Sequence, residues 1–518
     1  MKSILFLFLL IIHSLLVSQI QVGEFWGDEI LVPKSNLNTK KQRGVLYNNI
    51  VATSEGRIII STTELNSNGL PAGQFFSYSD DGGNNWSEPI SIQTPNLVTG
   101  GASVKLAIDK EDTIYTLWSG IVPSALFISI YDKNLNLIKD SIRVANQQLH
   151  GKFASHFTID NKNRIHVMWH EGNTDSPFTC EAFYTRSLDG GLTWETVQTL
   201  SNQDGHHSAF PHAEFDVAGD TLIIPWRDSV YTNNLQWDIK GVLSTNGGAS
   251  WGQPFNLEST EHKDWDPDLI ITPNGRIHLF YHIYEANNQF NAKVRYKFSD
   301  NLGSTWMFPS FPSNGQLSEG EFRSQLVEAC RYDNSNNVLW ISWKDERDFN
   351  FSTGDAQADV VVSYSLNNGL NWSTPEFVSN RSDSTVAFKA GTVLTNGEYI
   401  LNYEVISPGN IQSDSTFLRV FTRKRSNPIL NIDDNKLYQN DILIFPNHFQ
   451  NQLFIQTSLK NIEIKLINNK GKEINNMTLN SNQGTYSIDG NLFENGLYFL
   501  QIIDSFTGNT YQYKIIKL

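Results

Sequence analysis

The chain has 518 residues, of which 39% are hydrophobic and 18% charged, so it carries enough apolar side chains for a large core and a second folded unit. Asp and Glu outnumber Lys and Arg by 54 to 39, which gives a formal net charge of −15. Because the chain is acidic and has no cluster of basic residues, nucleic acid is excluded as a partner.

The first predicted element is an apolar N-terminal segment. Lys2 is followed by ILFLFLLIIHSLLV, which has the short basic start and the hydrophobic stretch of a secretory signal peptide. The stretch is shorter than the roughly 20 residues of a membrane-spanning helix, so no transmembrane anchor is expected. The sequence therefore predicts a signal peptide over residues 1–19.

A short turn motif recurs five times between Ser79 and Trp372. The copies SDDGGNNW, SLDGGLTW, STNGGASW, SDNLGSTW and SLNNGLNW fit Ser-x-Asp/Asn-x-Gly-x-x-Trp, allowing a small shift of the acidic position. Asp or Asn can bond the backbone N–H groups of the turn, Gly supplies positive φ, and Trp covers the apolar side of the hairpin. The residues expected to form these structural clasps are Asp81, Trp86, Asp189, Trp194, Asn246, Trp251, Asp300, Trp306, Asn367 and Trp372.

The spacing of the motif predicts how many repeats the chain contains. Trp86 and Trp194 lie 108 residues apart, about twice the following intervals of 57 and 55, so one repeat without the motif lies between them. Each repeat has an apolar strand, a turn and a second strand that ends in an aromatic residue, as in HFTIDNKNRIHVMWH. Seven such repeats run from about Val45 to Arg425, in the length range of four-stranded propeller blades.

We therefore expect an all-β fold with a seven-bladed β-propeller over residues 24–426, closed by the N-terminal stretch EILVP. Six blades are the alternative, if the first repeat only completes the last. Cys180 and Cys330 fall about three repeats apart, so we expect two small buried side chains and no disulfide.

The C-terminal part differs in composition. An Asn-rich linker is placed at residues 427–436, and short alternating strands such as IEIKLINNKGKEI predict a small β-sandwich over residues 437–518. Its ending, with NGLYFL and the segment Lys514–Leu518, resembles the C-terminal sorting domain of the type IX (Por) secretion system of Bacteroidetes, although FPNH departs from the usual Pro-Asn-Pro. The resemblance implies the type IX machinery as a partner and export through the periplasm and outer membrane. A generic adhesive sandwich is the alternative.

The five clasped turns resemble the Asp boxes, or BNR repeats, of the sialidase-like superfamily. The resemblance implies that they connect the third and fourth strands of a blade, on the face away from the active site. Function is then expected at the opposite mouth, where first strands begin and second strands end. The sequence is polar at these points, as in WHEG, WRDS and WKDERD.

Several polar residues are predicted to line this mouth. The repeat spacing brings Lys105, His156, His212 and Asp268 to one equivalent position on the inner strands. Arginine can pair with a sugar carboxylate, and histidine or a carboxylate can act as a general base. The alternative is that they merely line a wet channel. The candidate catalytic residues are His156, His212, Arg227, Asp268, His282 and Arg323. The candidate substrate-binding residues are Lys105, His170, Asp228, Lys344, Arg347 and Glu404.

No metal or cofactor is assigned. His156, His212 and Asp268 on successive blades could hold a metal ion, but the sequence does not set ligand spacing across blades. The identity of any cofactor is left open.

The resemblance also implies which residues a sialidase would need for hydrolysis. Sialidases use an arginine triad, a tyrosine nucleophile backed by a glutamate, and an aspartate acid/base. Here the Arg-Ile-Pro signature is missing, since the region reads LYNNIVATSEG with Arg43 out of register, and Phe388 falls where the tyrosine is expected. Arg227, Arg323 and Arg347 could form a substitute triad, but none stands in a family motif.

Three functions stay open on the sequence. The first is an exported propeller that recognises an extracellular glycan or glycoprotein, with cleavage or as a non-catalytic adhesion protein. The second is a diverged exo-α-sialidase, in which Tyr281 or Tyr403 would replace the nucleophile. The third is a polysaccharide lyase on uronate glycans, with a histidine base and an arginine that neutralises the carboxylate. Phe388 counts against the second, and nothing separates the first from the third.

Overall fold

The computed structural model describes residues 22–23, 25–37, 41–44, 48–68, 71–92, 104–121, 124–146, 152–172, 179–209, 214–215, 220–229, 237–285, 288–309, 324–325, 330–345, 359–379, 385–406, 418–428, 442–445, 448–449, 452–457, 459, 461–468, 472–479, 484–490, 493–505 and 510–517. In this part of the chain the elements are strands, which confirms the all-β prediction. None of the described segments is a helix long and apolar enough to cross a membrane. The predicted signal peptide and most of the predicted linker lie outside these residues.

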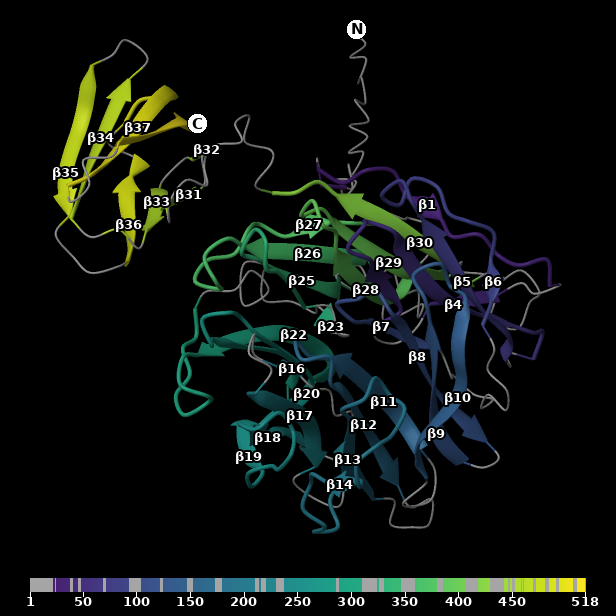
Figure 1. The fold of residues 1–518 in the computed structure, drawn as a ribbon. Helices are drawn as coiled ribbons and strands as arrows, with labels where there is room; N and C mark the ends of the chain where they lie inside the picture. Colours follow the sequence, from purple (N-terminus) through teal and green to yellow (C-terminus); the bar gives the residue numbers. More distant parts are fainter. Residues whose placement is uncertain are drawn as a thin grey trace, which may run out of the picture.

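We divide the strands between Ile50 and Arg425 into successive antiparallel groups, called units 1 to 7 (Figure 1). Units 4 and 5 share one sheet through a parallel contact, and units 7 and 1 share another. Unit 1 contains β3 (Ile50–Ala52), β4 (Ile58–Leu65), β5 (Pro71–Ser79) and β6 (Ile90–Ser91). Unit 2 contains β7 (Lys105–Ile108), β8 (Ile114–Ile121), β9 (Ser124–Tyr131) and β10 (Leu137–Asn146). Unit 3 contains β11 (Lys152–Ile159), β12 (Ile165–Gly172), β13 (Cys180–Ser187) and β14 (Gln198–Thr199).

The later units repeat this order with small variations. Unit 4 contains β15 (Ser208–Ala209), β16 (Glu214–Phe215), β17 (Leu222–Ser229), β18 (Trp237–Ser244) and β19 (Phe255–Glu258). Unit 5 contains β20 (Lys263–Ile271), β21 (Ile277–Glu285) and β22 (Asn288–Ser299). Unit 6 contains β23 (Ser324–Gln325), β24 (Arg331–Asp333), β25 (Val338–Asp345), β26 (Asp359–Ser365) and β27 (Glu376–Phe377). Unit 7 contains β28 (Thr385–Val393), β29 (Tyr399–Ile406) and β30 (Leu418–Arg425), joined by the N-terminal β1 (Ile30–Leu31).

Local sequence explains why the first and second strands of a unit form a hairpin. In unit 2 the Asp109 carboxylate accepts the N–H groups of Glu111 and Thr113 at 3.0 and 2.8 Å. Asp160 does the same in unit 3. Such Asx turns favour a tight reversal, and the strand that follows is buried along its whole length, as β12 is.

The hydrophobic core lies between units. One cluster of buried side chains joins each pair of consecutive units from 1 to 7. A further cluster packs Ile50 and Ile58 of unit 1 against Ala390 and Ile400 of unit 7. In addition, β2 (Lys41–Arg43) pairs with both β30 and β4. The last unit is therefore in contact with the first.

The C-terminal part forms its own core. One sheet contains β31 (Ile442–Phe445), β33 (Gln452–Thr457) and β36 (Gly484–Asp489). The other contains β32 (His448–Phe449), β34 (Ile462–Asn468), β35 (Glu473–Leu479), β37 (Gly496–Asp504) and β38 (Thr510–Lys517). A single cluster combines side chains of both sheets, including Leu453 and Leu500, which are fully buried.

Candidate functional site

Each unit has two ends, separated by the length of its second strand. In unit 3, Ile165 pairs with Ser187, where a predicted clasp begins, and Gly172 pairs with Cys180 at the other end of the strand. The same register holds in units 4 and 5. A strand of this length spans more than about 20 Å. We call the two ends the clasp end and the mouth.

The clasp turns share one hydrogen-bond pattern. In the third unit, Ser187 Oγ donates to Asp189 at 2.8 Å and accepts from the N–H of Gly191, while Asp189 accepts the N–H of Thr193 at 2.9 Å. Hydrogen bonds from Thr193 lower the pKa of Asp189 to about 2. Asp81, Asn246 and Asn367 hold the same position in their turns.

The prediction of Asp300 in the fourth turn is wrong. Asn301 accepts from Ser299 Oγ at 2.9 Å and from the N–H of Thr305 at 2.9 Å. Only the residue two places after the serine lies over the turn, and an amide oxygen accepts there as well as a carboxylate does. Asp300 instead pairs with Arg276 at 2.6 Å.

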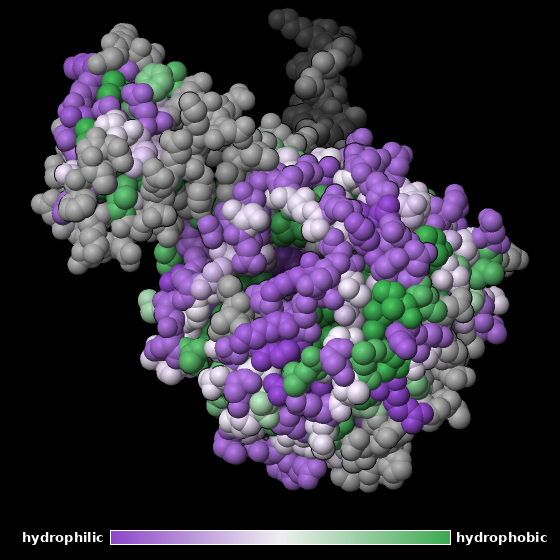
Figure 2. Space-filling view, viewed as in Figure 1, coloured by the Kyte–Doolittle hydropathy of each residue, from purple (hydrophilic) through white to green (hydrophobic). Residues whose placement is uncertain are grey.

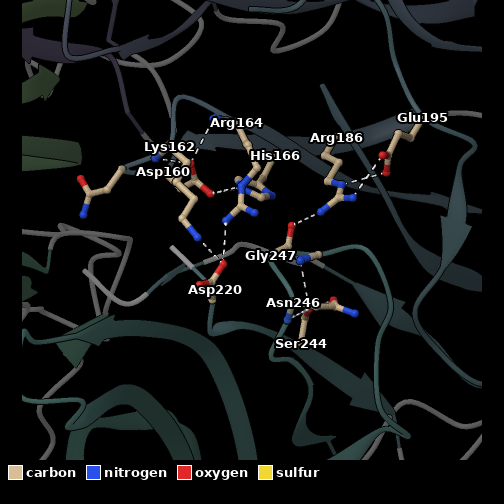
Figure 3. A network of polar contacts seen from close by, with 12 residues as sticks. Asp160, Lys162, Arg164, His166, Arg186, Glu195, Asp220, Ser244, Asn246 and Gly247 are labelled. Atoms are coloured by element: carbon tan, nitrogen blue, oxygen red, sulfur yellow. Dashed lines mark hydrogen bonds and ion pairs between the residues drawn. The ribbon is translucent and has the colours of Figure 1, made fainter. Parts of the chain in front are cut away.

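The clasps also bind neighbouring units to one another. Figure 3 shows the clasp of unit 4 against unit 3, where Arg186 donates to the carbonyl of Gly247 and pairs with Glu195 at 2.8 Å. Nearby, Lys162 of unit 3 pairs with Asp220 at 2.6 Å. This end of the units is therefore a structural seam.

A buried pair supports the same seam. Asp160 accepts from Arg164 at 2.6 Å and lies 3.1 Å from His166 Nε2 (Figure 3). Burial opposes ionisation of Asp160, but hydrogen bonds from His166 and Arg164 hold its pKa at about 2. The pKa of His166 is lowered by burial.

At the mouth, equivalent positions carry five of the predicted residues. Each one directly follows the aromatic residue of the second strand, and the strand registers place all of them at the same distance from the clasp end. These residues are His170, Arg227, His282, Lys344 and Glu404.

The predicted inner-strand equivalence agrees with the register for the described residues. Lys105, His156 and Asp268 each lie opposite the residue that precedes the second-strand aromatic. All three are buried, with 5 to 6% exposure. His212 lies outside the described residues, as do Arg323 and Arg347.

Two of these inner residues form contacts between units. His156 of unit 3 contacts Asn48, with its Nε2 3.2 Å from Asn48 Nδ2. Arg331 of unit 6 donates to Oδ1 of the same asparagine at 2.6 Å. Asn48, which precedes unit 1, therefore connects units 3 and 6. Asp268 accepts the N–H of Cys330 at 2.9 Å. Beside these contacts is a cavity of about 330 Å³ lined by inner strands of six units. Its lining includes Asn48, Leu106, Phe157, Ile270, Arg331 and Thr392.

Arg227 is the centre of a separate cluster. Its guanidinium carbon lies 3.8 Å from the ring centroid of Trp265 and 5.4 Å from that of Trp237. Its Nη1 lies 3.2 Å from Asp266 Oδ1, and the arginine side chain is 13% exposed. Two aromatic rings and a carboxylate therefore hold this cation in one orientation.

Aromatic rings continue on both sides of Arg227. His207 stacks on Trp237 with centroids 5.8 Å apart, and Trp237 meets Trp265 edge to face at 5.1 Å. Trp265 contacts Tyr284 at 6.0 Å, and Tyr284 contacts His282 at 5.0 Å. We call these five side chains the aromatic row. His207, Trp237 and His282 are buried, while Trp265 and Tyr284 are partly exposed. Partly exposed rings of this kind can pack against a sugar.

The environment of the mouth changes the protonation of its histidines. Burial, together with the positive charges of Arg227 and Lys105, lowers the pKa of His170 to about 3. Burial and Arg227 also lower the pKa of His207. Both imidazoles are consequently neutral at pH 7, beside a permanent cation.

Other predicted residues have different surroundings. Asp228 accepts from Ser208 at 2.7 Å and from Trp226 at 3.0 Å, and pairs with Lys240 at 2.6 Å. Glu404 is 1% exposed and lies 3.6 Å from Arg43. Asp228 is thus held by neighbours of its own unit, and Glu404 lies in unit 7, apart from Arg227 in unit 4.

Phe388, predicted at the place of a sialidase nucleophile, lies in β28, and its side chain is outside the described residues. Cys180 and Cys330 are each 2% exposed, in unit 3 and unit 6. Among the described residues, no group of three or more His, Cys, Asp or Glu side chains is arranged to hold a metal ion.

Four members of the Arg227 cluster were not among the residues predicted from the sequence. They are His207, Trp237, Trp265 and Asp266. Trp265 and Asp266 stand in the segment KDWDPD at the start of β20, so the only available signal was an aromatic and an acidic residue where a first strand begins.

Comparisons with known proteins identify the C-terminal part. Residues 443–517 match the family described as the secretion system C-terminal sorting domain. The predicted sorting domain is therefore confirmed, and it indicates export to the cell surface or beyond. A search of curated proteins found no match.

Several solved structures are similar in shape at low identity. A protein of unknown function from Dyadobacter fermentans is 9% identical with a TM-score of 0.46, over 79% of this chain and 100% of that one. The polysaccharide lyase Uly1 is 9% identical with a TM-score of 0.48, over 77% of this chain and 93% of that one. The NanB sialidase of Streptococcus pneumoniae is 14% identical with a TM-score of 0.38, over 79% of this chain and 72% of that one.

Proposed function

We propose that this chain is an exported seven-bladed β-propeller of the sialidase-like superfamily that recognises anionic extracellular glycans at its mouth. The C-terminal unit is a β-sandwich read by the type IX secretion machinery. The orientation of Arg227 between Trp237 and Trp265 is the observation that carries the proposed recognition.

The packing of the units supports seven blades over six. Unit 1 has its own four strands and packs against unit 2, in addition to its contact with unit 7. The expected closing stretch EILVP supplies β1, in which Ile30 pairs with Thr422 of β30. These contacts fit a closed ring whose last sheet is completed by the start of the chain.

The chemistry of the mouth favours an anionic sugar. A guanidinium held beside two indole rings is suited to pair with a carboxylate, and the partly exposed rings of Trp265 and Tyr284 are suited to the apolar face of a sugar ring. Much of the surface turned to the viewer in Figure 2 is hydrophilic, with apolar residues in smaller patches. The protein carries a net charge of −15, so a held cation at the mouth supplies the local positive charge that an anionic ligand needs.

Sialidase-type hydrolysis is the less favoured activity. Tyr281 is 5% exposed and donates to Glu258, and Tyr403 is fully buried and donates to Glu29. Burial and Glu258 raise the pKa of Tyr281 well above its ordinary value. Neither tyrosine is placed to attack a sugar at the mouth.

A polysaccharide lyase is the second candidate function. The observation in its favour is that neutral His170 and His207 lie near Arg227, so a proton acceptor and a group that neutralises a carboxylate share one site. The low pKa of His170 makes it a weak base, and His207 is therefore the better candidate.

Binding measurements on the mature protein test the proposal. We expect oligogalacturonate or 3′-sialyllactose to bind while neutral lactose does not, and Arg227→Gln to weaken binding by about tenfold or more. Isothermal titration measures the affinities, and Arg276→Gln, at the clasp end, is the control. Ultraviolet absorbance of unsaturated products separates a lyase from a binding protein. Equal binding by wild type and Arg227→Gln would refute the proposed site.

A further inference from the structure

Asp266 is the carboxylate that faces Arg227 across the mouth. Its Oδ1 lies 3.2 Å from Arg227 Nη1, and its side chain is 29% exposed, against 13% for the arginine. The acid therefore lies on the more open side of the pair.

The backbone at Asp266 has an uncommon conformation. Its φ is +41°, in the region that side chains other than Gly seldom adopt and that Asp and Asn tolerate best. The pairing of β20 with β21 also shifts between Trp265 and Asp268, so Asp266 stands in a bulge. Bulges of this kind re-aim a side chain, and here the bulge turns the carboxylate toward unit 4.

We propose that Asp266 is an internal competitor for the ligand, a specificity-determining residue whose carboxylate occupies the place on Arg227 that the carboxylate of an anionic glycan takes. This inference rests on the proposed function. Ligand binding then consists of an exchange, in which one carboxylate leaves the guanidinium and another replaces it. No covalent step is involved.

The exchange follows from the immobility of the arginine. Trp265 covers one face of the guanidinium at 3.8 Å and Trp237 lies at 5.4 Å, so these rings limit how far the cation can turn from Asp266 toward a ligand. Two carboxylates on the same edge of one guanidinium would repel each other. A ligand without a full negative charge would not displace the Asp266 carboxylate from Arg227. The Arg227–Asp266 pair therefore selects for sugars with an ionised carboxylate.

Protonation of Asp266 would relieve the competition. Burial raises its pKa to about 6, against the opposing charge of Arg227. Arg227 is the charged group that acts on Asp266, and His170 and His207, which Arg227 also affects, are neutral. A sugar carboxylate stays ionised at pH 5, so affinity is expected to rise as the pH falls from 7.5 to 5.0.

Asp266→Asn in the full mature protein tests the competition, because Asn keeps the shape and tolerates the positive φ. With oligogalacturonate and 3′-sialyllactose as probes, we expect this variant to bind about fivefold or more tightly than wild type at pH 7.5, and the difference to shrink at pH 5.0. Asp300→Asn, which removes the acid of an Arg–Asp pair at the clasp end, should change affinity less than twofold. Thermal unfolding checks that both variants are folded.

The outcomes separate the two proposals. If wild type binds a probe and Arg227→Gln loses it, but folded Asp266→Asn binds equally or less tightly, the competition is refuted while the proposed function stands. If neither wild type nor Asp266→Asn binds either probe, both proposals are refuted. Binding by Asp266→Asn alone supports the competition, since the acid would then block wild type completely.

Discussion

Arg227 owes its fixed position to residues that are distant in the sequence. Trp265 and Asp266 come from the next unit, and their contacts with Arg227 cross a boundary between two sheets. Repeat spacing predicted one equivalent position for Lys105, His156, His212 and Asp268, and polar ends for the second strands that carry His170, Arg227 and His282, because each unit repeats the same strands. It did not predict which side chains of unit 5 reach unit 4, because a bulge in β20 has no periodic signal.

Glu404 provides a pH test at the residue scale. Burial raises its pKa to about 8 from an ordinary 4.5. Between these values the unfolded chain releases a proton that the folded protein keeps, so this residue makes stability fall as the pH rises from about 4.5 to 8. We expect Glu404→Gln to melt close to wild type at pH 5 and above it at pH 8, with on the order of 1.4 kcal/mol per unit of pKa difference.

Thermal melting from pH 5 to pH 8 measures this effect. Glu398→Gln, just before the same strand and paired with Lys424 at 3.0 Å, is the control and should leave the slope of melting temperature against pH unchanged. A Glu404→Gln variant whose stability falls with pH as steeply as wild type would show that Glu404 is not the cause.

At the element scale, the clasp turn both closes its own hairpin and docks on the preceding unit. Ser, Asp or Asn, Gly and Trp at fixed offsets predicted the hairpin, because its hydrogen bonds are local. The docking could not be predicted, because it depends on which side chain of the neighbouring sheet meets the turn. Asp300 was predicted to bond the turn because it is the acidic residue of the motif. The residue that bonds the turn is Asn301, because it lies two places after the serine.

Gly248 should therefore be more sensitive than a glycine in an isolated turn. It has φ +80°, and a Cβ atom there would collide with the Tyr184 hydroxyl of unit 3. Gly275 has φ +83° and nothing within 4 Å of the added carbon. We expect Gly275→Ala to cost about 1 kcal/mol and Gly248→Ala about 3 kcal/mol or more. Urea unfolding measures both, and equal costs would show that docking adds nothing to the turn.

At the scale of the whole molecule, the units depend on one another for their cores. The intervals between tryptophans predicted seven repeats, and the change in composition predicted a separate C-terminal unit. Both features can be seen in the sequence itself. The contact between unit 7 and unit 1 follows from packing, with Ile58 and Ile400 in one cluster. The N-terminal strand takes part through Val32, which is fully buried against Ile60 and Val420.

Val32→Asp should therefore destabilise the contact between unit 1 and unit 7. A charge at this position would be buried among Ile60 and Val420, so we expect the melting temperature to fall by more than about 5 °C. Leu31→Asp, on the neighbouring residue with 41% exposure, should change it by less than about 2 °C. Differential scanning calorimetry compares the two, and similar shifts would mean that the strand does not contribute to the core.

The pairing of β1 with β30 has a consequence for biosynthesis. Ile30 meets Thr422, so the two partners of this ladder leave the ribosome almost 400 residues apart. Until the second partner arrives, the nascent protein keeps an unpaired strand edge, and such edges invite association with other chains. We therefore expect fragments that end before Leu418 to aggregate more readily than the full chain.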